Sequence, residues 1–223
     1  MDDDSVLDME ILGFSHSTIN LLTEILTYHE QTEEFWKNGH LALQNEIKTK
    51  LRSIPTEDHY EYMADYGYDL HVAKNLYPTL HRESTLVTIH SYIENSLNLY
   101  ADLVRRCVKS NLRLKDINGA GIERAKIYLT KIGGLDFNRF GESWTFIKRV
   151  NELRNRIIHA GGILPEQKGD LHHFVCNCEY LEGNPGDSID IKRGFIECYI
   201  EHVINFYDVI HDDSPRLIGI ING

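Results

Sequence analysis

Residues 151–162, which read Asn-Glu-Leu-Arg-Asn-Arg-Ile-Ile-His-Ala-Gly-Gly, hold the side chains of this chain best suited to chemistry. Arg154 lies four residues from both Val150 and Ile158, so on a helix it would share an arc with apolar side chains. A guanidinium there can extend along the core into water, pair with a carboxylate, or bind an anionic ligand. His159 would lie in the last turn, where the helix dipole favours a charged imidazole. The segment therefore has two interpretations, an ordinary helix end and an anion site.

Two amphipathic helices must position this segment. Apolar residues at three- and four-residue steps predict a helix that Gly161 and Gly162 would end. Its stripe comprises Trp144, Ile147, Val150, Leu153 and Ile157. A longer stripe predicts a helix over residues 80–110, from Leu86 through Ile89, Ile93, Leu97, Tyr100 and Val104 to Val108. Glu94 and Asn95 lie close to that second stripe and are candidates for a supporting role.

The charge of the chain is unevenly distributed. The net charge is −11, which taken alone argues against binding to nucleic acid. Residues 103–160, however, contain 13 Lys+Arg and 5 Asp+Glu, a net charge of +8 against −19 for the remainder. The arginine–histidine segment thus belongs to a basic block, which indicates either a local anion-binding surface or neutralisation by the acidic remainder.

Length and composition indicate a globular protein in a reducing compartment. The 223 residues, 42% of them hydrophobic, suffice for a real core. No run of about 18 apolar residues predicts a membrane span, and no apolar signal core follows the acidic first residues. Four cysteines are too few and too scattered for a disulfide scaffold. We therefore expect a cytoplasmic protein with no membrane contact.

The rest of the chain predicts a mainly all-α fold with one small β-hairpin. We expect a frayed or strand-like leader over residues 1–14, a helix from about 15 to 37, an interruption at Gly39 and a break at Pro55. Residues 56–77 form a tyrosine-rich segment that Pro78 would close. The expected division is an N-terminal helical extension, 1–79, and a helical domain, 80–223, with a hairpin at about 170–192. A helix over about 193–211 and an extended tail over 214–223 complete it.

The expected hairpin raises the possibility of a metal site. Residues 171–180 and 188–192 flank a Gly/Pro/Asn turn, which predicts two paired strands. His172, Cys176 and Cys178 would then share one strand face. A second ligand cluster at zinc-site spacing is missing, so we favour ordinary strand residues over zinc.

Two segments together resemble the HEPN superfamily (higher eukaryotes and prokaryotes nucleotide-binding) of α-helical domains. They are residues 92–100, Tyr-Ile-Glu-Asn-Ser-Leu-Asn-Leu-Tyr, and residues 152–162, with Arg154, Asn155 and His159 matching an arginine–polar–histidine motif. The resemblance covers about residues 80–211 and implies a HEPN-like helical bundle. It also implies an endoribonuclease that needs no metal or other cofactor, such as a toxin or an antiviral-defence effector.

The chemistry that the resemblance implies is attack of the ribose 2′-hydroxyl on the adjacent phosphate, so RNA and not DNA would be cleaved. His159 would be the general base or acid, Arg154 would bind the phosphate, and Asn155 would orient either. Glu94, Asn95 and Arg156 would support them. We expect further RNA-binding charge from Arg105, Arg106, Lys148 and Arg149.

Helix geometry sets a condition on this chemistry. Positions five apart lie about 140° apart around a helix, so Arg154 and His159 do not converge easily within one chain. Convergence needs either the long arginine side chain to curl or a homodimer that places two copies of the segment face to face. The alternative hypothesis is a catalytically silent HEPN-like domain that binds RNA, a nucleotide or a protein partner such as an antitoxin or regulator.

Overall fold

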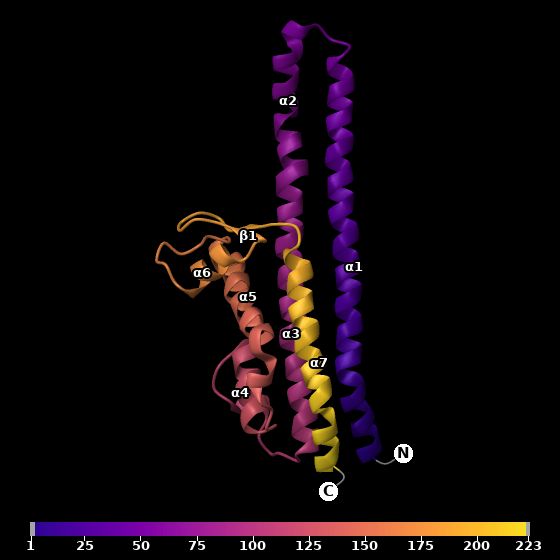
Figure 1. Ribbon diagram of the computed structural model, residues 1–223, viewed down its shortest axis with the longest axis vertical. Coiled ribbons are helices and arrows are strands. Elements are labelled where there is room, and N and C mark those ends of the chain that lie inside the picture. Colours follow the sequence, from indigo (N-terminus) through magenta and orange to yellow (C-terminus); the bar gives the residue numbers. More distant parts are fainter. Residues whose placement is uncertain (1–2, 222–223) are drawn as a thin grey trace.

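The computed structural model describes residues 3–221 and is mainly helical, as the sequence predicts (Figure 1). Its main elements are α1 (Asp3–Leu51), α2 (His59–His71), α3 (Tyr77–Cys107), α4 (Gly121–Lys131), α5 (Gly141–Ala160), α6 (Asp170–Asn177), β1 (Leu181–Glu182), β2 (Asp190–Ile191) and α7 (Phe195–Ile221). Over the described range, every helix is too short or too polar to cross a lipid bilayer.

Four helices form the bundle that holds the core. α1 packs along α7 and α3, and α5 packs on α7 and α3 from the other side (Figure 1). The interior is apolar and aromatic, with Ile11 and Leu22 from α1, Ile93 from α3, Ile147 from α5 and Ile200 from α7 all fully buried. Each such aliphatic side chain contributes about 1.5–3 kcal/mol through its removal from water. α1, which begins inside the expected N-terminal extension, is therefore part of the same core.

Beyond the bundle, α1 and α2 continue side by side as a two-helix arm, which we define as residues 34–77 (Figure 1). A short π-helical turn, Val72–Leu76, joins α2 to α3, so that the second helix of the arm leads directly into the bundle. Aromatic side chains on the arm remain in solvent, with Phe35 65%, Tyr60 87% and Tyr68 72% exposed. The arm thus has little core of its own.

Several expected features of the N-terminal half are wrong. α1 begins at Asp3 instead of following a frayed or strand-like leader, because residues such as Ile11 dock on the bundle. The helix also passes through Gly39 without a break, since the low helix propensity of glycine costs only about 1 kcal/mol at one position. Pro78 does not close a segment but lies in the first turn of α3. Proline has no N–H to donate, and its ring would clash with the preceding turn of a regular α-helix. The wider π-helical turn just before Pro78 leaves room for this ring.

The C-terminal half also departs from expectation. The hairpin before the last helix is present but very small, pairing Leu181 with Ile191 and Glu182 with Asp190. Most of the segment expected as its first strand is instead α6, which buries Leu171 and Val175 at a four-residue spacing. α7 continues through Pro215 to Ile221 instead of ending near residue 211. The expected extended tail is therefore wrong as far as residue 221, and residues 222–223 lie outside the described range.

Candidate functional site

Arg154 occupies the face of α5 that packs towards α3, and it is half-buried. Its Nη1 atom donates a hydrogen bond to Oδ1 of Asn155 at 3.0 Å. Its Nε atom is buried and has no hydrogen-bond partner among residues 3–221. Part of the guanidinium is thus held by the protein, while no carboxylate of the described chain neutralises it.

His90 of α3 is the histidine that faces Arg154. Its pKa is lowered to about 4. Burial is the largest cause and the charge of Arg154 the second, while a hydrogen bond with the Asn151 side chain opposes them in part. Nδ1 of His90 lies 2.8 Å from the hydroxyl of the fully buried Tyr199 on α7. At neutral pH the ring is therefore uncharged and is fixed in place by three helices.

Glu94 lies one helical turn after His90 on the same side of α3 and is half-buried. Its carboxylate borders the first residue of α4, where a Cβ on Gly121 would lie 3.7 Å from the Glu94 oxygens. Asn95, by contrast, is exposed on another face of α3. Of the two supporting residues expected on this helix, Glu94 thus lies on the Arg154 side and Asn95 does not.

His159 lies in the last turn of α5 and is exposed. Its ring makes no hydrogen bond or ion pair with any other residue between 3 and 221. Gly161, at φ 59°, then ends the helix in the left-handed conformation expected of a glycine cap. Within one chain, Arg154 turns towards α3 and His159 towards solvent, so the two side chains are not brought together.

The predicted RNA-binding cations all lie in ion pairs. The pairs are Arg105 with Asp102, Arg106 with Glu10 and Asp102, Lys148 with Glu123, and Arg149 with Glu152 and Asp170. Arg105 also lies about 22 Å from His90 along α3, at 1.5 Å per residue. In the described chain Arg154 and Arg156, unlike these cations, have no carboxylate partner. Arg154 and Arg156 are therefore among the cations of the described residues whose charge remains available to an anion.

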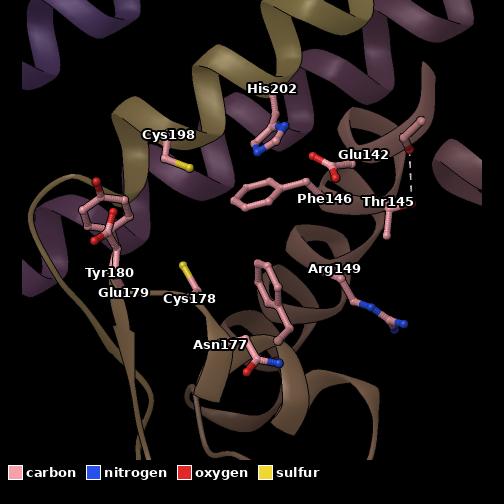
Figure 2. Close-up of a pocket in the computed structure, with 12 residues that line it drawn as sticks. Glu142, Thr145, Phe146, Arg149, Asn177, Cys178, Glu179, Tyr180, Cys198 and His202 are labelled. Carbon is pink, nitrogen blue, oxygen red and sulfur yellow. Dashed lines mark hydrogen bonds between the residues drawn. The ribbon is translucent and has the colours of Figure 1, made fainter. Parts of the chain in front are cut away.

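A separate open cavity of about 930 Å³ lies between the first half of α5, the end of α6 and α7 (Figure 2). Figure 2 shows Phe146 beside His202, whose rings stack at 4.1 Å, and the thiols of Cys178 and Cys198 on the same wall. Burial raises the pKa of Cys198 to about 11 and raises that of Cys178, so both remain protonated and weakly nucleophilic at neutral pH. Arg154, Asn155 and His159 do not line this cavity.

The three residues weighed as a possible zinc site do not share a strand. His172 and Cys176 face each other one turn apart on α6, with Sγ 3.7 Å from Nε2, and Cys178 caps the helix. Within residues 3–221, the metal-ligand atoms that do gather belong to His29, Glu33 and His81, at the base of the two-helix arm. Sequence reasoning missed this group and His90, although His29 and Glu33 show the four-residue spacing that places two ligands on one helix face.

Comparisons with protein-family models, with curated proteins and with solved structures give no match to this chain.

Proposed function

We propose that this protein is a metal-independent endoribonuclease of the HEPN type, with its site formed where two copies of the end of α5 meet. The observation that carries the proposal is the contrast in charge pairing. Arg154 and Arg156 have no carboxylate partner in the described chain, whereas the nearby Arg149 is bound by Glu152 and Asp170. An unpaired guanidinium and an exposed histidine at the same end of one helix suit a phosphodiester ligand once a second copy brings such groups together.

The surroundings of His159 favour a contact with a second copy. Ile158 is 45% exposed and Ile163 is 48% exposed, so apolar surface flanks the imidazole on both sides. Burial of such side chains stabilises an interface. Arg154 and His159 diverge within one chain, so a two-fold contact through this surface would give each guanidinium an imidazole from the other copy.

The proposed reaction is a transesterification. His159 of one copy removes the proton of a ribose 2′-hydroxyl, and the 2′-oxygen attacks the adjacent phosphorus. The bond from phosphorus to the 5′-oxygen of the next nucleotide breaks, and this oxygen takes the proton that it needs from water, whose hydroxide is then neutralised by the proton held on His159. Arg154 neutralises the charge that builds on the phosphate oxygens. The products carry a 2′,3′-cyclic phosphate and a 5′-hydroxyl.

The test is cleavage of a mixed RNA pool in EDTA by the purified protein. We expect cyclic-phosphate products from the wild type, and no cleavage of an oligonucleotide with a 2′-deoxyribose at each scissile position. Arg154→Ala and His159→Ala should each reduce the rate by about 100-fold or more. Arg52→Ala and His211→Ala, which remove an exposed arginine and an exposed histidine elsewhere, should leave it unchanged. Intact RNA with the wild type, or equal loss in the control variants, would overturn the proposal.

A silent binding domain is the second candidate, because Arg105, Arg106, Lys148 and Arg149 are already ion-paired and Arg154 does not meet His159 within one chain. On this hypothesis the wild type binds RNA or a nucleotide, Arg154→Ala weakens binding, and no product forms. Fluorescence anisotropy of a labelled RNA in the same buffer as the cleavage assay separates binding from turnover.

A further inference from the structure

A buried polar cluster lies at the base of the two-helix arm, outside the site described above. His29 and Glu33 lie one turn apart on α1, and His81 and Arg82 lie on α3. His29 is 0%, Glu33 4% and His81 9% exposed, although charged and polar side chains are rarely buried to this degree without partners. Glu197, in the first turn of α7, lies against the same group.

The ligand-bearing atoms of three of these residues converge. One nitrogen of His29, one of His81 and one carboxylate oxygen of Glu33 all lie within 4.8 Å of one another. Two ligands bound at about 2.0–2.2 Å to a tetrahedral ion lie about 3.4 Å apart, so the widest of these separations must close by about 1.4 Å, a shift of about 0.7 Å for each side chain. Nδ1 of His29 and Nε2 of His81 are 2.9 Å apart, so these two nitrogens need only separate by about 0.5 Å to bind the same ion.

A shell of partners orients these groups as metal ligands require. Nε2 of His29 lies 3.6 Å from Oε2 of Glu197, and both atoms are buried without a hydrogen-bond partner in the described chain. An N–H on Nε2, directed at that carboxylate, would leave the Nδ1 lone pair for a metal. Arg82 holds Glu33 through two bonds of 2.7 Å, which fixes the carboxylate and leaves its other lone pairs open.

The electrostatics of the cluster suit a cation. The carboxylates of Glu33 and Glu197 bring two negative charges, and Arg82 brings one positive charge. These two carboxylates and one guanidinium therefore bring a net negative charge inside the protein, which a divalent ion would offset.

We propose that His29, His81 and Glu33 form a binding site for a divalent transition-metal ion of the zinc class, with Glu197 and Arg82 as positioning residues. Two imidazoles and one carboxylate are a common zinc donor set. The site would fasten α1 to α3 where the two-helix arm leaves the bundle, so its role is structural. Binding requires the proton between Nδ1 of His29 and Nε2 of His81 to leave that contact, so that each imidazole keeps one proton, on Nε2 of His29 and on Nδ1 of His81.

The first experiment uses the unmodified, tag-free wild type. After equilibration with Zn²⁺ and gel filtration, elemental analysis should find about one zinc per chain. Removal of the metal with EDTA should lower Tm by about 5 °C or more, and Zn²⁺ should restore it. Co²⁺ should give visible d–d absorption bands. Fewer than about one ion per ten chains, together with an unchanged Tm, would overturn the proposal in favour of a plain His29–His81 hydrogen bond.

Variants then locate the ion. His29→Gln and His81→Gln should lose the zinc and the EDTA-dependent shift in Tm. Glu197→Gln should still bind zinc, about 10–100-fold more weakly, because it only orients His29. Cys176→Ser, which disrupts the exposed His172–Cys176 pair, and His16→Gln, at an exposed position of α1, are controls that should retain full occupancy. Loss of zinc in Cys176→Ser, or full retention in His29→Gln and His81→Gln, would place the ion elsewhere and reject this site.

Discussion

The Nδ1 atom of His90 on α3 lies 2.8 Å from the hydroxyl oxygen of Tyr199 on α7, and both side chains are fully buried. Burial disfavours the charged forms of both, lowering the pKa of His90 to about 4 and raising that of Tyr199 well above its usual value. A neutral ring therefore faces the guanidinium of Arg154 on α5. The pair fixes this face of α3 without adding a charge that would either neutralise or repel Arg154.

Mild acid should destabilise the protein through His90. The unfolded histidine takes up a proton near pH 6.5 and the folded one only near pH 4, so the unfolded state binds more protons between these values. The contribution to stability is complete above about pH 6.5 and declines as the pH falls towards 4, by about 3 kcal/mol in total. Urea unfolding at pH 7 and at pH 4.5 measures the loss.

The matched variants for this prediction are His90→Gln and His211→Gln. The first removes the perturbed histidine and should flatten the decline. The second removes an exposed histidine and should leave the decline in stability unchanged. His81 and His202, whose pKa values are also lowered chiefly by burial, add a decline of the same sign in every variant. An equal slope in His90→Gln and the wild type would assign the pH dependence to other groups.

A mixing experiment tests whether the proposed ribonuclease site is shared between copies. Arg154→Ala and His159→Ala proteins should each be inactive alone, yet mixing them allows dimers in which one site keeps both groups. Random exchange at equal amounts gives about a quarter of the wild-type activity. No recovery after verified subunit exchange would place Arg154 and His159 of the same chain in one site.

The ion pair between Glu33 of α1 and Arg82 of α3 should contribute far more to the free energy of unfolding than a solvent-exposed pair within α1. Glu33 is 4% and Arg82 15% exposed in their side chains, whereas Glu34 and Lys37 are 46% and 52% exposed. In metal-free protein, Arg82→Ala should cost about 3–5 kcal/mol, because it leaves a buried carboxylate unpaired. Lys37→Ala should cost under about 1 kcal/mol. Chemical denaturation in EDTA measures both, and similar costs would contradict the buried geometry.

Two glycines should respond to alanine with opposite signs. Gly194 precedes α7 at φ +100°, and a Cβ there would lie 2.5 Å from the ring of Tyr180. Gly194→Ala should therefore destabilise the fold by about 1–3 kcal/mol. Gly39 lies within α1 with no atom within 4 Å of the added carbon, so Gly39→Ala should stabilise it by up to about 1 kcal/mol. Thermal unfolding compares the two, and a stabilised Gly194→Ala variant would contradict the described turn.

Periodicity predicted the helices whose apolar stripes are long. Ile89 and Ile93 of α3, and Ile147 and Val150 of α5, are buried as their spacing indicates. Local signals failed where long-range packing decides the outcome. Gly39 lies inside a continuous helix that packs along α2 and the π-helical turn in the arm, and Pro215 is accommodated within α7. Alternation over 171–180 suggested a strand, but Leu171 and Val175 satisfy the helical spacing equally well.

The candidate site was only partly accessible from the sequence. Arg154, Asn155 and His159 are adjacent in the chain, so their types and spacing could be read directly. His90 is far in sequence from both Tyr199 and Arg154, and it meets them only through the packing of three helices. The same holds for His29 and His81, which are separated by 52 positions. Apart from the four-residue spacing of residues on each helix, a single sequence does not indicate which residues of different helices lie in contact.

The two-helix arm has a consequence for how the protein opens. Between residues 34 and 77, Ile47 and Val72 are the buried hydrophobic side chains, so few contacts resist separation of the two helices there. Amide protons along the arm will exchange with solvent through sub-global fluctuations, while those facing Ile93 and Ile147 exchange only when the whole bundle melts. The polar cluster at the foot of the arm marks the boundary between these two cooperative units.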